Sequence, residues 1–475
     1  MRGDVILTVL LVFAVLVRLW GIRAGLPFMH NPDEPTNMRV VDAMVRANDP
    51  NPHFFNYPSL AIYLWTALHL DGPLLGWIPH LAGTAPITQV MGVTYSPATG
   101  QVLLDRLASA AAGTALVGVG WATARRLTTG IAPAAVTALL LALSPTLVDY
   151  SRLVTPDILA TLLVAAATHA TLRILSHGTW PSYLAAGSLV GLAASAKYTA
   201  AIVAVAVIAA AALSGRRTAL WRLPAAGLAA IGAFLATTPY AVLDRSEFLA
   251  GLFFESNHYA TGHPGMEGDT IGFYTGMLTG VESPIAALGV AGIAVAVTRH
   301  RWRPAVVLAA FPVVYGAFIA AQVVRNDRTL MLLLPGLAVL AALAVEALPT
   351  RVLRVGAAAA TVATLAAILV PALPAPGLTT WDEARAWLNA NGAGRPILVE
   401  SYGPWLTPSP SVSTCNRAID CPPPPGGLIV LADEMYGRYT PACPDEHQRY
   451  ARLLGLPELA HFTGNGTTLR IVAAP

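Results

Sequence analysis

Two adjacent carboxylates, Asp33 and Glu34, follow the first apolar segment of the chain, within the run His30-Asn31-Pro32-Asp33-Glu34-Pro35. Carboxylates are costly to keep near lipid, so their place here favours a wet cavity in which binding or chemistry occurs. A carboxylate in such a cavity can take a proton from a hydroxyl, and we assign this role of general base to Asp33. Glu34 would orient a substrate or bind a metal. The alternative is that both side chains only cap the helix that follows.

Five cations stand at predicted helix ends on the same side of the membrane as the acidic pair. They are Arg106, Arg152, Lys197, Arg325 and Arg328. A single arginine at a helix end can extend to the lipid headgroups at modest cost, which is an ordinary role. Five together favour an anionic ligand, because guanidinium groups hold pairs of phosphate oxygens. We therefore predict a lipid phosphate or diphosphate bound by Arg106, Lys197, Arg325 and Arg328.

Other residues are expected to line the same cavity, although each has a simpler explanation. Asp157 follows a proline at a predicted helix start, where an acidic residue is most often a cap. His258 and His263 are five positions apart, which is not a metal-ligand spacing on one helix face, so solvated loop histidines are the simpler interpretation. A divalent metal held by Glu34 or His258 stays open, and no other cofactor is predicted. The cavity candidates are Tyr57, Arg152, Asp157, Tyr198, His258 and His263.

The composition is that of a polytopic membrane protein. Of the 475 residues, 55% are hydrophobic and 12% charged, whereas a soluble domain has roughly 25% charged residues. The net charge of +3 is small and spread over many connections, so no nucleic-acid surface is indicated. We find no P-loop and no dinucleotide-type glycine pattern, so no nucleotide site is expected.

Apolar segments of about 20 residues predict an α-helical protein with about eleven transmembrane helices. They lie near 5–23, 102–123, 132–148, 155–175, 182–196, 199–214, 223–240, 274–297, 304–322, 329–347 and 354–372. Arginine-rich connections alternate with poorly charged ones, which places the N-terminus inside and the C-terminal part outside. Residues 182–214 could instead form one long tilted span, but merging them would break the alternation.

Two segments should lie on the outer surface, and they are 25–101 and 244–272. The first contains a polar helical stretch from Glu34 to Ala47 and an amphipathic one from Leu60 to Leu70. We expect both to lie in the membrane interface, with aromatic side chains at headgroup depth. Those aromatic residues are Tyr57, Tyr63, Trp65 and Trp77.

Residues 1–373 are thus predicted to form a membrane domain, and residues 374–475 a small outer α/β domain. Helical spacing covers 381–391, and strands are expected at 396–400 and 427–432. The three cysteines, Cys415, Cys421 and Cys443, all fall in this part, where one disulfide of undetermined pairing is permitted. Three free thiols in a cytosolic tail is the alternative.

Several short motifs resemble the membrane-embedded glycosyltransferases of the C superfamily. The nearest family includes the protein O-mannosyltransferases and the bacterial aminoarabinose transferases. The resemblance covers roughly residues 5–350. It rests on Asp33-Glu34, Tyr57-Pro58-Ser59-Leu60, Arg106, Thr155-Pro156-Asp157, Ala196-Lys197-Tyr198, Thr238-Pro239-Tyr240 and Arg325-Asn326-Asp327-Arg328.

The resemblance implies an enzyme that transfers a sugar from a polyprenyl-phosphate donor to an acceptor hydroxyl, with inversion, on the extracytoplasmic face. The acceptor would be a glycan, a lipid or a protein. Asp33 matches the catalytic acidic position, and Arg325, Arg328 and Lys197 match the region that holds the donor phosphate. Tyr57 departs from the pattern, because the aminoarabinose transferases have a lysine before this proline. A transporter or flippase for a lipid-linked sugar is the alternative, because it would need the same cations without breaking a bond.

Overall fold

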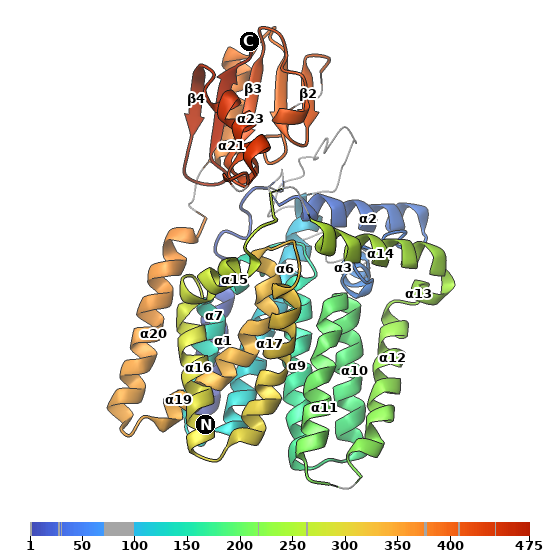
Figure 1. Cartoon of the computed structure of the whole chain (residues 1–475), viewed down its shortest axis with the longest axis vertical. Coiled ribbons are helices and arrows are strands. Elements are labelled where there is room, and N and C mark those ends of the chain that lie inside the picture. The colour runs from blue at the N-terminus through green and yellow to red at the C-terminus, as the bar shows by residue number, and fades with distance from the viewer. Residues whose placement is uncertain are drawn as a thin grey trace.

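A bundle of long helices forms one part of the molecule and an α/β domain the other, with the N-terminus and the α/β domain at opposite ends (Figure 1). The computed structural model describes residues 2–26, 29, 31–70, 99–216, 218–262, 265–374, 378–406, 409–441 and 443–475. His30, Trp77 and His263 lie outside the described residues.

All eleven apolar segments are helical. The elements are α1 (Arg2–Leu19), α6 (Thr99–Leu127), α7 (Ile131–Leu143), α9 (Asp157–Ser176), α10 (Trp180–Ala196), η1 (Tyr198–Val203) with α11 (Ala204–Leu213), α12 (Leu223–Thr237), α15 (Thr270–Thr279) with α16 (Ser283–Thr298), α17 (Trp302–Ala320), α18 (Asp327–Leu330) with η3 (Met331–Leu333) and α19 (Leu334–Ala347), and α20 (Arg351–Ala372). The helix breaks at Lys197, which has an extended backbone, so residues 182–214 are not one continuous helix.

Fewer of these helices could cross a membrane by themselves than the sequence predicts. Within the described residues, six are long and apolar enough, or seven if α15 and α16 count as one span bent by 90°. At a rise of about 1.5 Å per residue, the 13 residues of α7 fall short of a hydrocarbon core about 30 Å thick. The structure therefore confirms a multi-pass helical architecture, while the number of eleven spans stays a prediction.

The arginine-rich connections lie together at one end of the bundle. Arg126 donates a hydrogen bond of 2.8 Å to the Ser176 hydroxyl, and Arg216 donates one of 2.7 Å to the Ser176 carbonyl. Arg301 contacts both the Leu127 carbonyl and the Glu346 carboxylate. Connections far apart in the sequence thus bond to one another, as the alternation of basic and uncharged connections predicts.

Glycines allow close contact between α10 and α12. A Cβ atom on Gly187 would overlap the backbone of Ala226, and one on Gly191 would overlap the backbone of Ala230. The two glycines are four positions apart, which is the spacing that brings two membrane helices into backbone contact. Hydrophobic burial contributes little between helices in lipid, so this close packing is what holds the pair together.

Shorter helices cover the end of the bundle nearest the α/β domain. They are α2 (Asp33–Ala47), α3 (Leu60–Leu70), α8 (Pro145–Tyr150), α13 (Tyr240–Leu243) and α14 (Arg245–Thr261). Helices α2 and α14 run across the long helices rather than along them (Figure 1). Both predicted helices of the first outer segment are present, and the Trp65 side chain is buried in a core formed mainly by α2 and α3, so it does not face the lipid headgroups.

The predicted outer loop 244–272 is wrong for its first part, which is the 17-residue helix α14. Asp244 is its N-cap and accepts a hydrogen bond from the backbone N–H of Glu247. An acidic cap followed three residues later by glutamate is a helix-start pattern that the sequence contains. The low apolar content of this helix hid it from a search for membrane spans.

The α/β domain contains a five-stranded sheet of order β2-β1-β3-β5-β4, with β2, β1 and β3 parallel and the other two pairings antiparallel. Its elements are α21 (Thr380–Asn391), β1 (Ile397–Glu400), β2 (Val412–Cys415), η4 (Ala418–Asp420), β3 (Leu428–Ala432), α22 (Asp433–Tyr436), α23 (Pro444–Leu454), β4 (Glu458–Phe462) and β5 (Leu469–Ala473). The helix and two strands expected from the sequence are confirmed. Cys415 and Cys421 form a disulfide, and Cys443 is a free thiol.

A buried carboxyl group, Glu400, joins the parallel strands to the helices of this domain. Its oxygens accept hydrogen bonds from the backbone N–H groups of Ala432 at 2.7 Å and Ala418 at 3.1 Å, and from the Tyr450 hydroxyl at 3.0 Å. Burial raises the pKa of Glu400 from 4.5 to about 7. The folded domain therefore favours the protonated carboxyl.

We predict that Gly191→Ala lowers the thermal midpoint of the purified protein, because overpacking costs about 1–3 kcal/mol. Gly227→Ala in α12 is the matched control, since a Cβ atom there meets nothing within 4 Å. Thermal melting in detergent measures both. Equal midpoints for the two variants would contradict the packing role of Gly191.

We also predict that the α/β domain loses stability as the pH rises. The raised pKa of Glu400 stabilises the folded domain. This stabilisation is fully present below pH 4.5 and is lost as the pH rises through about 7, which corresponds to about 3 kcal/mol of unfolding free energy. Hydrogen exchange in β1 and β3, corrected for intrinsic rates, should show this loss in the wild type but not in Glu400→Gln. Glu458→Gln, at an exposed position of β4, should keep the wild-type slope.

Candidate active site

A cavity of about 1050 Å³ lies between the bundle and the α/β domain. Asp33, Tyr57 and Arg328 line it from the membrane part, and Tyr402 and Arg438 from the α/β domain. It therefore contains the proposed general base and two of the predicted phosphate ligands, Arg106 and Arg328. Residues nearly 300 positions apart in the chain meet in this cavity.

Asp33 lies in the first turn of α2 and is paired with Arg328. The Asp33 carboxylate accepts a hydrogen bond from Nη1 of Arg328, and the Tyr57 hydroxyl is 3.5 Å from the same nitrogen. The N-cap of α2 is Pro32, and it is Asn31 whose side-chain oxygen accepts a hydrogen bond of 3.0 Å from the first backbone N–H of the helix, that of Asp33. The alternative that Asp33 is only a cap is therefore wrong. The carboxylate is 26% exposed, so it is accessible from the cavity.

Glu34 also lines the cavity, but its carboxylate is held in a buried ion pair with Arg106. Its two oxygens accept hydrogen bonds from Nε and Nη2 of Arg106 at 2.8 and 2.7 Å. Nη1 of Arg106 donates to the carbonyls of Ile22 and Ala24, each at 2.8 Å. The backbone N–H of Val154 donates to Glu34 at 3.0 Å. Because every nitrogen of the guanidinium is engaged, this geometry argues against Arg106 as a phosphate ligand and Glu34 as a metal ligand.

The other predicted cations are also mostly paired. Lys197 lies 2.5 Å from Asp157, whose second oxygen is buried without a hydrogen-bond partner among the described residues. Asp157 does not cap α9, because the N-cap there is Pro156. Arg152 bonds to Asp149 and to the carbonyl of Trp20.

Arg325 lies apart from this group. It donates a hydrogen bond of 3.2 Å to the carbonyl of Asp269, and its guanidinium lies 5.4 Å from the centre of the Phe273 ring. The five predicted cations therefore do not form one group around the acidic pair. Four of the five hold a carboxylate each, and Arg325 packs on a neighbouring loop.

A second cavity of about 430 Å³ adjoins the first and is mostly apolar. Lys197 and Tyr198 line it, which places both predicted residues next to the site. The two cavities share four lining residues, Asn56, Tyr57, Glu255 and Val324. A ligand with a polar head and an apolar chain could therefore occupy both at once.

His258 belongs to α14 and not to a loop, so its interpretation as a solvated loop histidine is wrong. Its ring stacks on Phe254 at 6.1 Å and lines the larger cavity. Burial lowers the pKa of His258, which favours the neutral imidazole.

Several residues that line the cavities were not among the predicted site residues, and Tyr150, Asp327 and Glu255 are three of them. The Tyr150 hydroxyl donates a hydrogen bond of 2.7 Å to Asp327, and Glu255 lies at the junction of the two cavities. Burial raises the pKa of Glu255. Asp327 was visible between the arginines of the Arg325-Asn326-Asp327-Arg328 motif. Glu255 could be placed only after α14 was known to be a helix.

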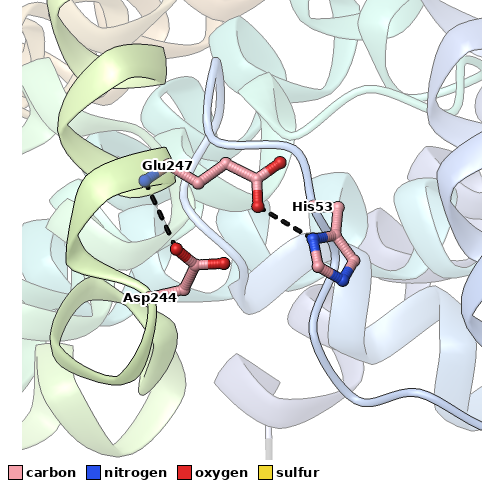
Figure 2. A group of neighbouring side chains, drawn as sticks. All are labelled: His53, Asp244 and Glu247. Carbon is pink, nitrogen blue, oxygen red and sulfur yellow. Dashed lines mark hydrogen bonds and ion pairs between the residues drawn. The ribbon is translucent and has the colours of Figure 1, made fainter.

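A group with metal-type ligands lies elsewhere on the outer surface. His53, Asp244 and Glu247 bring their ligand atoms within 4.8 Å of one another (Figure 2). Nδ1 of His53 is 2.8 Å from Glu247, and this hydrogen bond is the main reason that the pKa of His53 is raised. One nitrogen and two carboxylate ligands suit a divalent cation. The same contacts also suit an imidazolium that joins the outer loop to α14.

The chain is similar to known proteins both in sequence and in fold. Residues 101–242 match the family model described as dolichyl-phosphate-mannose-protein mannosyltransferase. The crystal structure of ArnT from Cupriavidus metallidurans bound to undecaprenyl phosphate superimposes with a TM-score of 0.55 and 15% identity, over 98% of this chain and 97% of that chain. The two chains therefore share one fold over almost their whole lengths.

The oligosaccharyltransferase of Archaeoglobus fulgidus has a TM-score of 0.54 at 12% identity, over 98% of this chain and 74% of that chain. None of the curated proteins matches the sequence of the chain. The resemblance to C-superfamily glycosyltransferases drawn from short motifs is confirmed. The family match contains Arg106, Asp157 and Lys197, the three residues whose ion pairs hold the membrane part of the site.

We predict that Glu34→Gln and Asp33→Asn have different effects on stability. Removing one partner of a buried ion pair costs about 3–5 kcal/mol, so Glu34→Gln should melt at a clearly lower temperature. Asp33→Asn should melt near the wild type, because the Asp33 side chain is partly exposed. A similar loss of melting temperature for the two variants would contradict this separation of roles.

Proposed function

We propose that the protein transfers a sugar from a polyprenyl-phosphate donor to an acceptor hydroxyl. The observation that carries this proposal is the junction of a polar cavity, which contains Asp33 and Arg328, with an apolar cavity that contains Lys197. A lipid-linked sugar has the same division into a polar head and an apolar chain. The ArnT structure that shares this fold has undecaprenyl phosphate bound, and the matching family model is described by its dolichyl-phosphate donor.

The donor phosphate would lie between Arg328 and Lys197, near Tyr57. Within the described residues, only Nη1 of the Arg328 guanidinium makes hydrogen bonds, to Asp33 and Tyr57. The remaining donors can therefore face a phosphate. Tyr57 carries no positive charge, so Arg328 and Lys197 would supply the charge that a lysine provides in the aminoarabinose transferases.

The arrangement supports a direct displacement at the sugar C1. The acceptor oxygen forms a bond to C1 while the bond from C1 to the phosphate oxygen breaks, and the electron pair leaves with the phosphate. Arg328 and Lys197 stabilise the charge that develops on this leaving group. The proton of the acceptor hydroxyl goes to Asp33, and inversion follows from attack opposite the leaving group.

Pairing with Arg328 also explains how Asp33 would be regulated. In the free site the arginine neutralises this carboxylate. A bound phosphate would compete for the guanidinium and leave Asp33 more available as a base. The base would then be most active when the donor is present.

Two observations support an active site on the extracytoplasmic side. The α/β domain contains a disulfide between Cys415 and Cys421, which is typical of oxidising compartments. The arginine-rich connections lie at the opposite end of the bundle, as expected for the cytoplasmic side. Residues 1–373 would then be the membrane transferase domain and residues 374–475 the outer domain.

The test is a transfer assay with the purified protein in lipid and radiolabelled polyprenyl-phosphate sugars. We expect Asp33→Asn to lower the release of polyprenyl phosphate by about 10²–10⁴-fold. Arg328→Ala should lower it by about 10²–10³-fold and also weaken donor binding. The control is Arg46→Ala, on the same helix as Asp33, which removes only an exposed pair with Asp42 and should keep wild-type activity.

Two outcomes would contradict the proposal. If the Asp33→Asn variant kept near wild-type transfer, Asp33 would not be the general base. Donor that binds in an Arg328-dependent way, but stays intact with every acceptor class, would favour a flippase for a lipid-linked sugar. Movement of labelled donor between the leaflets of a vesicle would then identify that activity.

A further inference from the structure

The α/β domain forms a wall of the larger cavity, facing the membrane part. Residues from four of its segments contribute, among them Ser401, Tyr402, Asn416, Arg417, Glu434 and Arg438. Nothing in the transfer step described above uses these residues. The donor is accounted for by the opposite side of the cavity and by the apolar cavity next to it.

Specific contacts hold this wall in place over the site. Trp405 packs against the buried core between α2 and α3, and its ring is also 5.9 Å from that of Trp381 in the domain itself. The side chain of Arg438 lies against Gly265 of the membrane part, where a Cβ atom would overlap it. The domain is therefore docked beside α2, the helix that begins with Asp33.

Tyr402 and Arg438 form the centre of the wall. Tyr402 follows β1 and has a backbone φ of 67°, a conformation that non-glycine residues rarely adopt. Its carbonyl accepts a hydrogen bond of 2.9 Å from Trp381. The Arg438 guanidinium lies 4.7 Å from the centre of the Tyr402 ring and donates to its hydroxyl. The fold thus maintains an unfavourable backbone conformation at the place where this side chain faces the cavity.

Asp33 and Tyr402 line the same cavity. Burial raises the pKa of the Tyr402 phenol. Arg438 opposes this rise, and the negative charges of Glu434 and Asp33 add to it. An acceptor held against Tyr402 and Arg438 could present a hydroxyl to the Asp33 carboxylate.

The wall offers hydrogen-bond donors and acceptors together. Among the described residues no carboxylate lies within ion-pair distance of Arg438, so its guanidinium can donate to a ligand. Asn416 accepts a hydrogen bond of 3.0 Å from Ser401 with its oxygen, which leaves its amide N–H groups for other partners. Glu434 supplies an acceptor. Each hydroxyl of a saccharide both donates and accepts, so this set suits a saccharide better than an apolar chain.

We propose that this wall is the acceptor subsite and that it binds a saccharide, with one hydroxyl directed to Asp33. The proposal rests on the proposed function, because it names the acceptor for the same reaction. Arg438 and Asn416 would set acceptor specificity, while Arg328 and Lys197 hold the donor. The α/β domain would then be a working part of the active site, and its sequence would select the acceptor.

The experiment uses the full chain in lipid, with radiolabelled undecaprenyl-phosphate hexoses and pentoses as donors. The acceptors are gluco-, galacto-, manno- and arabino-oligosaccharides, serine- and threonine-containing peptides, and hydroxyl-bearing lipids. We expect transfer to at least one oligosaccharide. Arg438→Ala and Asn416→Ala should each raise the KM for that acceptor at least tenfold. The kcat, the KM for the donor and the binding of undecaprenyl phosphate should stay at wild-type values.

Arg452→Ala is the matched control, because this arginine is exposed in the same domain and does not line the cavity. Thermal melting shows whether each variant is folded. Tyr402→Phe keeps the ring and removes only the hydroxyl, so it tests the wall if Arg438→Ala does not fold. It should also raise the KM for the oligosaccharide alone.

The outcomes separate this proposal from the proposed function. Transfer only to peptides or lipids, unaffected by the wall variants, would overturn the saccharide subsite and leave the transferase intact. An equal loss of donor and acceptor affinity would show that the wall is only structural and would also overturn it. Arg438-dependent binding of an oligosaccharide without release of polyprenyl phosphate would support the wall and contradict the transferase. If neither substrate binds, both proposals fail.

Discussion

The buried ion pair between Glu34 and Arg106 is the contact on which the position of the site depends. It joins the start of α2 to α6, and Arg106 also bonds the chain that leaves α1. Asn37, one turn further along α2, adds a hydrogen bond of 2.8 Å to the carbonyl of Val154. Asp33 is the neighbour of Glu34, so the buried ion pair also fixes the place of Asp33 in the cavity. The two adjacent carboxylates thus differ, because Glu34 is buried in a structural ion pair and Asp33 stays accessible from the cavity.

Ion pairing solves a general problem for a polar cavity at the edge of a membrane. An unpaired charge is costly there, yet a phosphate ligand requires cations. Here the cations near the cavity are held by carboxylates in the free protein, as with Arg328 and Asp33 or Lys197 and Asp157. An arriving phosphate can compete for a partly exposed pair such as Arg328 and Asp33. A phosphate cannot easily compete for the buried pair of Glu34 and Arg106, because every guanidinium nitrogen of Arg106 already donates a hydrogen bond within the protein.

The sequence predicted those parts of the structure that depend on local pattern. Continuous apolar segments located the long helices of the bundle, and two buried strands of the sheet were visible as runs of valine, isoleucine and leucine. Helix α14 was missed because its apolar content is low, and β2 was missed because its four residues, Val412–Cys415, are largely polar. Residue type also predicted that Asp33 and Arg328 belong to one site. It could not show which cations were already paired, because the partners are distant in the sequence: Glu34 and Arg106 are 72 positions apart, and Asp33 and Arg328 are 295.

The cavity is lined by both the membrane part and the α/β domain, so the site is complete only when both parts are folded and docked together. Trp405 inserts between this domain and the core of α2 and α3, so the helix that carries Asp33 has one face on the bundle and another toward the domain. A domain that only covered the cavity would need no more than such apolar contacts. This one also directs a tyrosine with a strained backbone and an arginine without a carboxylate partner among the described residues into the cavity. The strained backbone is costly, and such strain is kept where the surrounding structure enforces it. One wall of the cavity therefore depends on the membrane part, and the other depends on the folding and docking of the α/β domain.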